Sequence, residues 1–347
     1  MKKLLLTLSM LMLAMSECWA GATDGRFDIY WIDVEGGAAT LMVTPAGESI
    51  LIDTGNPGRR DANRILRVAT QVAGVRKIDH LITTHYHGDH YGGAALLATL
   101  MPVGVVYDNG KFAGMPNDPG QEYFEFPCDR RVVVNPGDQL TLKQTGDGPV
   151  VTLRCLGTRQ TFVDPDEKNP DNAAICATCQ PKDRDGSDNA NSVVSIVQFG
   201  KFRFFDGGDL TWNQEMKLVC PNDLIGPVDV YQVTHHGLDS SNNPVVLNTI
   251  KPRVAIMNNG DKKGCLPDVF ANLTATESIE RIFQLHKNLR PDGSINNVAD
   301  KYIANLGASE QCEGNYIHLS VAPDSANYIV SIPTNAGLQE TFTTRAK

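Results

Sequence analysis

The sequence lacks several features that would place it in a special class of protein. After residue 22, no apolar run approaches the roughly 18 residues that a membrane-spanning helix requires. No internal repeat is visible at the periods of roughly 20 to 50 residues typical of solenoids, and no flexible linker divides the chain. These absences exclude a repeat protein and predict one folded domain.

Positive charge is also scarce. The chain has 31 Lys and Arg residues against 40 Asp and Glu residues, a formal net charge of −9. Proteins that follow nucleic acid over a broad surface need many cations to neutralise phosphates, so the composition argues against that class. A basic cluster from Arg59 to Arg67 could form a local basic surface that contacts nucleic acid, but the solvent-exposed face of a helix is the simpler interpretation.

The start of the chain predicts a signal peptide. Two lysines precede an apolar run from Leu4 to Met15, which is too short to cross a bilayer, and small residues follow it up to Ala22. We expect residues 1–22 to be removed and residues 23–347 to be exported, either to a periplasm or outside the cell. Loss of two lysines and one glutamate with this leader changes the net charge from −9 to −10.

Seven cysteines follow the leader, at positions 128, 155, 176, 179, 220, 265 and 312. An odd number in an oxidising compartment allows up to three disulfides and one free thiol. Cys176 and Cys179 form a C-x-x-C pair, but they lie among polar residues rather than between a strand and a helix. We therefore expect a structural disulfide or two loop-pinning cysteines there, not a redox centre.

One stretch stands out from this ordinary background, residues 80–93 (H-L-I-T-T-H-Y-H-G-D-H-Y-G-G). Within six residues it carries four potential metal ligands, His85, His87, Asp89 and His90. Imidazole and carboxylate groups are rarely buried unless they are paired or ligated, and these follow an apolar strand. Because open α/β sheets bind ligands beyond the carboxyl ends of their strands, the pattern predicts a metal site.

Short strands alternate with helices along the rest of the chain. The expected strands are 26–33, 38–43, 49–52, 78–83, 103–107, 132–134, 139–143, 150–156, 191–199, 201–205, 228–233, 253–258, 316–321 and 328–332. The expected helices are 61–74 with Asp61 as the cap, 91–100, 212–219, 244–250 and 276–287. Polar insertions at about 108–131 and 158–190 interrupt the pattern, and we expect the first to reach over the site. The order indicates two packed β-sheets with helices outside, a four-layer α/β fold.

Other strand ends carry polar residues as well. Asp53 lies in L-I-D-T-G, Asp209 lies in G-G-D-L, and His235 and His236 lie in T-H-H-G. Adjacent histidines point in different directions, so one can bind a metal while the other contacts substrate or solvent. Asp53 either caps a turn or orients a ligating imidazole from behind.

Together these motifs resemble the metallo-β-lactamase superfamily. More narrowly, residues 32–41 (I-D-V-E-G-G-A-A-T-L), 191–197 (N-S-V-V-S-I-V) and 233–241 (V-T-H-H-G-L-D-S-S) are similar to the hydrolase domain of ComEC-type competence proteins. The resemblance covers about residues 27–332. It implies a single-domain αββα sandwich with a site for two divalent metal ions between the sheets.

The resemblance also implies a ligand set. Carried over by position, the first metal takes His85 and His87, and the second takes Asp89, His90 and His235, with Asp209 bridging both. His236 is the less favoured alternative to His235 and otherwise faces the substrate, and Asp53 stands behind the ligands.

One departure from the family pattern concerns the first metal. Many members supply a third histidine to it, but the corresponding loop in this chain reads G-S-D-N-A-N-S. Asp188 is the residue expected to substitute, with Asn191 behind it. Oxygen in place of nitrogen shifts the preference toward manganese or iron, although zinc remains the expected metal.

These observations predict an exported metal-dependent hydrolase. Two ions about 3.5–4 Å apart can hold a water as hydroxide at neutral pH, so no side-chain nucleophile is needed. Asp89 and Asp209 are the expected catalytic carboxylates. The expected substrate is a phosphodiester or similar ester in a small molecule or short oligonucleotide. The resemblance implies degradation of a DNA strand, but the negative net charge argues against a long binding surface for nucleic acid. The alternatives are a β-lactam or lactone hydrolase and a non-catalytic metal-binding protein with the same fold.

Overall fold

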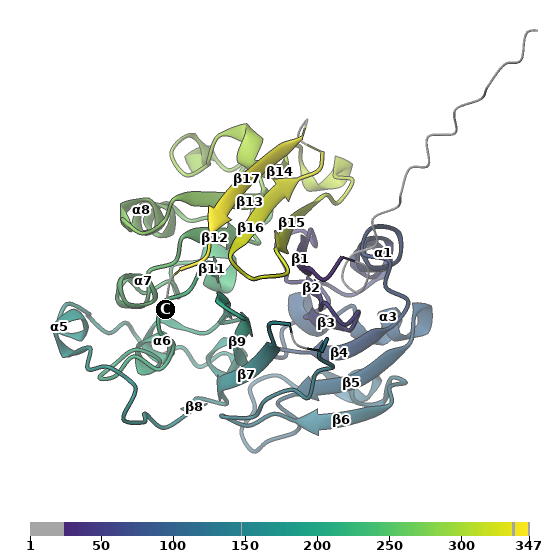
Figure 1. Ribbon diagram of the computed structural model, residues 1–347, viewed down its shortest axis with the longest axis horizontal. Coiled ribbons are helices and arrows are strands. Elements are labelled where there is room, and N and C mark those ends of the chain that lie inside the picture. Colours follow the sequence, from purple (N-terminus) through teal and green to yellow (C-terminus); the bar gives the residue numbers. More distant parts are fainter. Residues whose placement is uncertain (1–23, 147, 335–336, 346–347) are drawn as a thin grey trace, which may run out of the picture.

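The structure is a computed structural model that describes residues 24–146, 148–334 and 337–345. The expected leader, residues 1–22, lies outside them. Two mixed β-sheets pack face to face and helices cover their outer faces (Figure 1), which confirms the predicted four-layer αββα architecture. Among the described residues, no helix combines the length and the apolar character needed to span a bilayer.

The order of the strands across each sheet differs from their order along the chain. From one edge to the other, the first sheet contains β17 (Leu338–Thr343), β16 (Asn327–Ile332), β15 (Tyr316–Val321), β1 (Phe27–Ile32), β2 (Thr40–Val43), β3 (Ser49–Ile52), β4 (Ile78–Ile82), β5 (Val103–Asp108) and β6 (Arg130–Val133). The second contains β14 (Ile303–Asn305), β13 (Arg281–His286), β12 (Val254–Met257), β11 (Val230–Gln232), β10 (Phe202–Asp206), β9 (Val194–Phe199), β7 (Val151–Thr158) and β8 (Thr161–Phe162).

The helices are short. They are α1 (Arg59–Arg67), α2 (Gly88–Tyr91), α3 (Ala94–Leu100), α4 (Gly120–Glu125), α5 (Ala173–Cys176), α6 (Trp212–Lys217), α7 (Pro244–Ile250) and α8 (Pro267–Ala275). A π turn, η1 (Val68–Val72), extends α1, and the 3₁₀ turns are η2 (Asp188–Asn191), η3 (Thr234–Gly237), η4 (Pro291–Ser294), η5 (Asp300–Tyr302) and η6 (Ser309–Gln311).

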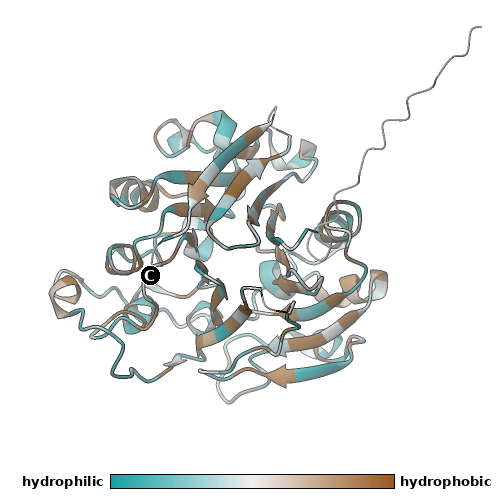
Figure 2. Ribbon diagram, in the orientation of Figure 1, coloured by the Kyte–Doolittle hydropathy of each residue, from teal (hydrophilic) through white to brown (hydrophobic). Residues whose placement is uncertain are grey.

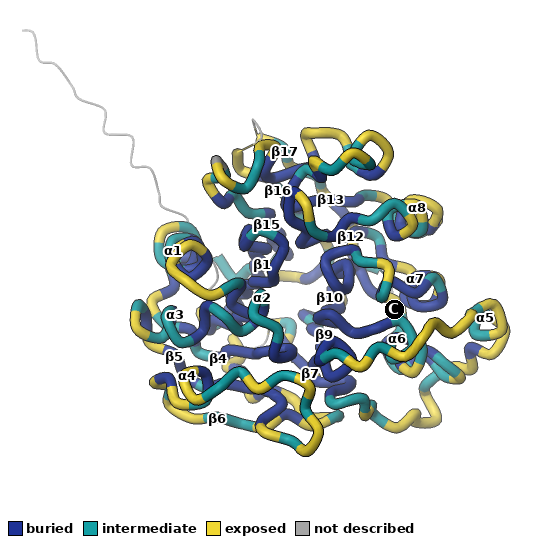
Figure 3. Tube along the Cα trace, turned by 180° about the vertical axis from the view of Figure 1, so that it is seen from behind, coloured by how far each residue is buried: buried dark blue, intermediate teal, exposed yellow. Residues whose placement is uncertain are grey.

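The core lies between the sheets and continues beneath the helices. Along β1, Phe27, Ile29 and Trp31 belong to the inter-sheet cluster, and Trp31 meets Phe204 of the opposite sheet with ring centroids 5.5 Å apart. The intervening Tyr30 and Ile32 pack instead in the cluster that α1 and α3 cover. Because both faces of the strand are buried, its sequence runs apolar with little alternation. Figure 2 shows the apolar colouring gathered on the strands, and Figure 3 shows the same strands buried.

Parallel runs in each sheet direct their carboxyl ends to the same edge. In the first sheet β3, β4, β5 and β6 are parallel, and in the second β10 to β14 are parallel. The loops after β3, β4, β10 and β11 carry the polar motifs of the sequence. Long-range packing therefore brings together segments that lie far apart in the chain.

One predicted helix is wrong. Residues 276–287 form a turn followed by the buried strand β13, and the helix of this region is α8, which lies before it. The spacing of Ile279, Ile282 and Phe283 fits a helical face, but β13 is paired in parallel with both β12 and β14. A strand buried on both faces has apolar residues at adjacent positions, which imitate a helical pattern.

Smaller predictions also need correction. Residues 139–143 make only an isolated bridge, between Gln139 and Arg154, and β17 was not expected. Helix α1 begins at Arg59 with Gly58 at its N-cap position. Asp61 does not cap it, because its carboxylate accepts hydrogen bonds from Asn56 instead.

The first insertion packs behind the histidine loop. Tyr123 of α4 lies with its ring centroid 5.5 Å from that of Tyr86 and 5.4 Å from that of Tyr91, and the Tyr86 hydroxyl donates to the Gly110 carbonyl. These contacts support the residues on either side of Tyr86.

The second insertion is joined to the chain after α6 by a disulfide between Cys176 and Cys220. The expected structural disulfide is thus present, but Cys179 is not part of it.

Candidate metal centre

The histidine-rich motif forms a tight loop at the carboxyl end of β4. His85 and His90 are fully buried. His85 Nε2 lies 3.1 Å from His87 Nδ1, so the two imidazoles face each other. The loop is held close to the end of β3, where the Thr54 amide donates to the His90 carbonyl at 2.6 Å. A Cβ on Gly93 would lie 2.2 Å from the Thr54 carbonyl oxygen, so only glycine fits there.

The second sheet adds a carboxylate and two histidines to this loop. After β10 the chain turns through Gly207 and Gly208, the latter with φ +55°, and the Asp209 amide donates to Ser192 Oγ. Asp209 Oδ2 lies 3.1 Å from His90 Nε2 and 3.9 Å from His85 Nε2. Asp209 therefore reaches across the space between the sheets to both halves of the histidine motif.

Four residues form the most compact set of donor atoms. One atom each from Asp89, His90, Asp209 and His236 lie within 4.8 Å of one another. His90 Nε2 and His236 Nε2 are 3.2 Å apart, and His236 Nε2 is 3.3 Å from Asp209 Oδ2 and 3.4 Å from Asp89 Oδ2. We call this set the Asp209 group.

The two adjacent histidines have different positions around the centre. His236 lies in the Asp209 group, whereas the sequence favoured His235. Both residues have φ +55°, and this left-handed backbone turns the His236 side chain fully inward. His235 stays at the edge, with Nε2 3.5 Å from Asp209 Oδ2 and Nδ1 within hydrogen-bonding distance of Ser240 and Ser241. A pair of adjacent histidines in a sequence does not reveal this turn.

Asp53 lies behind His90, as the sequence suggested for it. Its Oδ2 is 2.7 Å from His90 Nδ1 and accepts a hydrogen bond from Thr84 Oγ1. His90 Nδ1 therefore donates to Asp53, and its Nε2 faces the centre. The His236 ring is oriented in the same way, because its Nδ1 donates a hydrogen bond to the Asn258 carbonyl at 3.3 Å and its Nε2 faces the centre.

Asp188 has a different position from the one expected of a third ligand. It is fully buried, but its two carboxylate oxygens accept from the Tyr86 amide at 2.6 Å and from Asn191 Nδ2 at 2.9 Å. It thus binds the backbone between His85 and His87. Its position fits an anchor of the histidine loop better than a metal ligand.

Two residues near the centre had escaped sequence reasoning. The Lys263 ammonium pairs with Asp89 Oδ2, from a loop after β12 whose sequence gives no metal-site signal. Asn189 lies with Nδ2 3.2 Å from His235 Nε2, and its buried Oδ1 has no hydrogen-bond partner among the described residues. The N-A-N sequence could have drawn attention to Asn189, but it does not show that the Asn189 side chain points toward His235.

The electrostatics of the centre favour bound positive charge. Burial opposes ionisation of Asp209, but the neighbouring His236 and His90 outweigh it and hold the pKa of that carboxyl well below its usual range. The pKa of Asp89 is lowered in the same way, against burial, by His90, His236 and Lys263. Burial lowers the pKa of His85 well below its usual range, so this imidazole is neutral at pH 7. At His90 burial is outweighed by Asp209, Asp53 and Asp89, which raise the pKa of this imidazole well above its usual range, so a metal bound there would replace a proton.

The donor set fits divalent metal ions. His85 Nδ1 and His90 Nδ1 lie 3.1 Å and 3.3 Å from Thr84 Oγ1, which itself donates to Asp53. These contacts leave the Nε2 lone pairs of both rings directed at the centre. Lone pairs that face one another at such short distances repel unless a cation or a proton lies between them. Imidazole nitrogen and carboxylate oxygen are also the common ligands of catalytic zinc and related metals.

The fold and this site agree with one comparison. Residues 32–163 match the family model described as the metallo-beta-lactamase superfamily. This part of the chain is therefore similar to the metallo-β-lactamase superfamily, and the two-sheet architecture already described is consistent with that similarity.

Individual relatives narrow the comparison. The chain is 26% identical over 226 residues, 65% of its length, to "Competence protein ComA" of Neisseria gonorrhoeae, and 26% identical over 267 residues, 76% of its length, to "Recombination protein 2" of Haemophilus influenzae. It is 37% identical over 84 residues, 23% of its length, to a "UPF0173 metal-dependent hydrolase" of Cupriavidus metallidurans. The predicted resemblance to ComEC-type proteins is confirmed as a distant homology. The matches cover 26%, 28% and 26% of these relatives, so the chain spans about a quarter of their length.

Proposed function

We propose that the protein is a metal-dependent hydrolase that cleaves a phosphodiester or a similar ester with two divalent ions. The facing donor atoms of the centre carry this proposal, since His85 Nε2 and His87 Nδ1 at 3.1 Å and His90 Nε2 and His236 Nε2 at 3.2 Å form two adjacent sets. Asp209 lies between the sets. A relative whose name describes a metal-dependent hydrolase supports the same class.

The proposed ligands divide between the two sets. His85, His87 and Asp209 would hold one ion, and Asp89, His90, Asp209 and His236 would hold the other. Three protein ligands leave an open position on the first ion, as catalytic zinc sites do. Zinc suits the imidazole-rich set best, and manganese and iron are the alternatives. When bound, the two ions would supply an activated water and polarise the ester.

The chain's own residues prepare the site for this chemistry. Asp53 and the Asn258 carbonyl fix the orientation of His90 and His236, so the donor atoms are in place before substrate binds. Asp188 holds the backbone of the histidine loop through the Tyr86 amide. These groups reduce the reorganisation that the reaction requires.

Two residues are placed to contact the substrate. The Lys263 ammonium, beside Asp89, can bind an anionic oxygen, which supports a phosphate ester over a neutral substrate. His235 lies at the edge of the centre, and burial lowers its pKa to about 4, so it is neutral at pH 7. A neutral imidazole beside the centre can donate or accept one hydrogen bond to the bound ester.

The surroundings favour a small substrate. A cavity of about 620 Å³ reaches Ser240, whose Oγ lies 3.0 Å from His235 Nδ1, and its other lining residues include Lys182, Asp183, Asp185, Trp212 and Asp239. Three of these side chains are carboxylates, which repel a continuous phosphate backbone. Together with the net charge of −9, this supports a small diester or short oligonucleotide.

A substrate panel tests the proposal. Metal-free protein is loaded with zinc, manganese or iron, its metal content is measured, and hydrolysis of an aryl phosphodiester, an aryl phosphomonoester, a lactone and a cephalosporin is followed. We expect two equivalents of metal and hydrolysis of the phosphodiester, both lost in His87→Ala. His318→Ala is the matched control. His318 lies on β15 and is hydrogen-bonded to Asp28 on β1, so the variant removes a histidine outside the proposed centre.

The other outcomes separate the alternatives. Hydrolysis of the lactone or cephalosporin alone would overturn the phosphodiester assignment. Two bound metals with no hydrolysis of any substrate would identify a metal-binding protein without catalysis. Full activity in His87→Ala would reject the metal centre itself.

We also propose that the protein is exported. The leader pattern of residues 1–22 supports this, and so does the disulfide between Cys176 and Cys220, because such bonds persist in oxidising compartments. Fractionation of expressing cells, with the mass of the mature protein, tests it. Recovery of the uncleaved chain from the cytosol would contradict it.

A further inference from the structure

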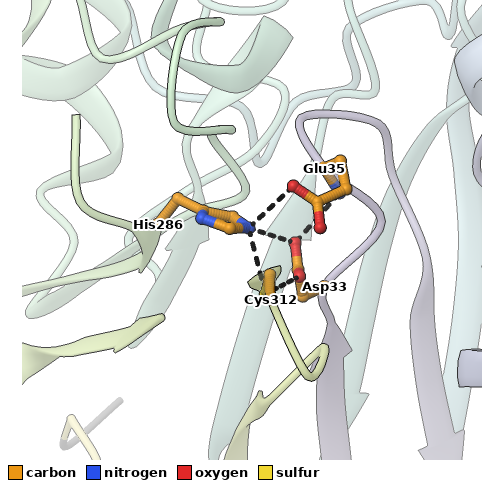
Figure 4. Close-up of side chains that lie close together, drawn as sticks. All are labelled: Asp33, Glu35, His286 and Cys312. Carbon is orange, nitrogen blue, oxygen red and sulfur yellow. Dashed lines mark hydrogen bonds and ion pairs between the residues drawn. The ribbon is translucent and has the colours of Figure 1, made fainter. Parts of the chain in front are cut away.

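A second set of metal-binding residues lies at the other end of the loop between β1 and β2 (residues 33–39). It consists of Asp33, Glu35, His286 and Cys312, and one donor atom from each lies within 4.8 Å of all the others (Figure 4). Asp33 and Glu35 follow β1, His286 ends β13, and Cys312 follows η6. We call this set the Cys312 group.

The donor atoms face a common point. His286 Nε2 lies 2.8 Å from Asp33 Oδ1, 3.3 Å from Glu35 Oε2 and 3.8 Å from Cys312 Sγ. Cys312 Sγ lies 3.1 Å from Asp33 Oδ2. Tetrahedral zinc with bonds of about 2.0 Å to nitrogen and oxygen and about 2.3 Å to sulfur separates its ligand atoms by about 3.2–3.6 Å. The distances of 2.8, 3.3 and 3.8 Å from His286 Nε2 to the other three proposed ligand residues are close to these values.

A cation already neutralises part of the group. Arg64 Nη1 donates to Asp33 Oδ2 at 2.9 Å and to Glu35 Oε1 at 2.7 Å. Each carboxylate still presents its other oxygen to His286. Without a metal, Arg64 and a protonated His286, whose Nε2 lies 2.8 Å from Asp33 Oδ1, would together balance the two carboxylates.

This ion-pair network is incomplete in two respects. The Glu35 side chain is only 4% exposed, and apart from the 3.3 Å ion-pair contact with His286 Nε2 its Oε2 makes no hydrogen bond within the described residues. The network also contains a thiol, which two carboxylates and two cations do not require. Cys312 is outside any disulfide and also contacts Asn305 Oδ1 at 3.1 Å.

We propose that the Cys312 group is a second, structural zinc site, held by Asp33 Oδ1, Glu35 Oε2, His286 Nε2 and Cys312 Sγ. Zinc would displace one proton from His286 and one from Cys312 to solvent, so the net charge of the buried group stays unchanged. The ion would satisfy Glu35 Oε2 and give the thiolate its partner. Arg64 would remain on the outer oxygens of the two carboxylates.

The site would stabilise the loop that supports the Asp209 group. Beyond Glu35 the same loop passes under Asp89, where the Ala38 amide donates to the Asp89 carbonyl at 3.1 Å. A Cβ on Gly37 would lie 2.4 Å from that carbonyl oxygen, so the contact is tight. The inference does not depend on the proposed hydrolysis, because the two groups share no donor residue.

Cobalt substitution tests the proposal directly. Cobalt bound to a thiolate gives a near-ultraviolet charge-transfer band, and the Asp209 group contains no cysteine. We expect metal-free protein to develop this band with one equivalent of cobalt, and Cys312→Ser to lose both the band and one equivalent of bound zinc. Cys128→Ser is the matched control, because Cys128 is another unpaired, partly exposed cysteine outside the group.

Alkylation provides a second measurement that needs no variant. Iodoacetamide labelling of the wild-type protein, read by mass spectrometry, should show that zinc protects Cys312 and leaves the labelling of Cys128 unchanged. If Cys312→Ser fails to fold, this result decides alone. Equal labelling of Cys312 with and without zinc would overturn the proposal in favour of a metal-free ion-pair network. A band that persists in folded Cys312→Ser would also overturn it.

Discussion

The Asp209 group and the Cys312 group lie near opposite ends of one loop, but the chain assembles them differently. In the first, two of the four members are adjacent, Asp89 and His90, within a motif of six residues. In the second, His286 and Cys312 lie 253 and 279 positions from Asp33. The first has only nitrogen and oxygen donors, whereas the second has a thiol and is closed by Arg64. A local motif therefore marks the proposed catalytic centre, while a site made by long-range packing leaves no motif.

The largest expected effect separates the two groups by function. His90→Ala should lower kcat/KM by at least about 10³-fold, about 4 kcal/mol, because it removes a ligand of the catalytic ions. His286→Asn should lower the melting temperature and zinc content with a much smaller loss of kcat/KM. Steady-state kinetics and thermal unfolding of both variants check this. Equal losses of activity would show that the groups act as one unit.

The second effect concerns the adjacent histidines. His236→Ala should lose metal from the Asp209 group, because its Nε2 lies among the donor atoms. His235→Ala should keep the metal and lower kcat by about tenfold, the size expected for the loss of one hydrogen bond to the substrate. Metal analysis beside kinetics distinguishes them. The reverse pattern would restore His235 as the ligand that the sequence favoured.

A smaller effect is expected behind the ligands. Asp53→Asn should weaken metal affinity by about 10- to 100-fold, because the amide no longer fixes the His90 imidazole as a carboxylate does. Competition with a chromogenic chelator measures this affinity. Asp61→Asn is the control, since Asp61 is equally buried but bonds to Asn56. A similar loss in both variants would point to general destabilisation.

The smallest effect tests substrate charge. Lys263→Met should lower kcat/KM for the phosphodiester by about tenfold, through the loss of one charge-assisted contact. Hydrolysis of a neutral ester, where it occurs, should change little. The neighbouring Lys262→Met is the control, because Lys262 is exposed. Equal losses on charged and neutral substrates would assign Lys263 to the support of Asp89 instead.

The sequence predicted the fold well where strands are followed by histidine or aspartate motifs. The two-sheet sandwich was predicted from the order of strands and helices and from the family resemblance, which the motif from His85 to His90 and the other strand-end motifs carry. Residues 276–287 were mispredicted, since a central strand with both faces buried imitates an amphipathic helix. Local patterns distinguish these cases poorly when tertiary packing covers both faces.

The candidate site was predicted in outline and not in detail. The positions of His235 and His236 depend on two consecutive left-handed residues, which no spacing reveals. Asp188 was expected as a ligand because of its place in the loop, but its oxygens are occupied by Tyr86 and Asn191. Lys263 reaches Asp89 from a loop 174 positions away, so only the folded chain shows it.

The left-handed histidine pair also has a consequence for how metal loss would be observed. Two non-glycine residues in this conformation store on the order of 1–3 kcal/mol each, which the surrounding contacts must offset. If metal binding provides part of that offset, demetallation should loosen η3 before it loosens the strands. Hydrogen exchange at the His235 and His236 amides would then report metal occupancy in solution, without any substrate.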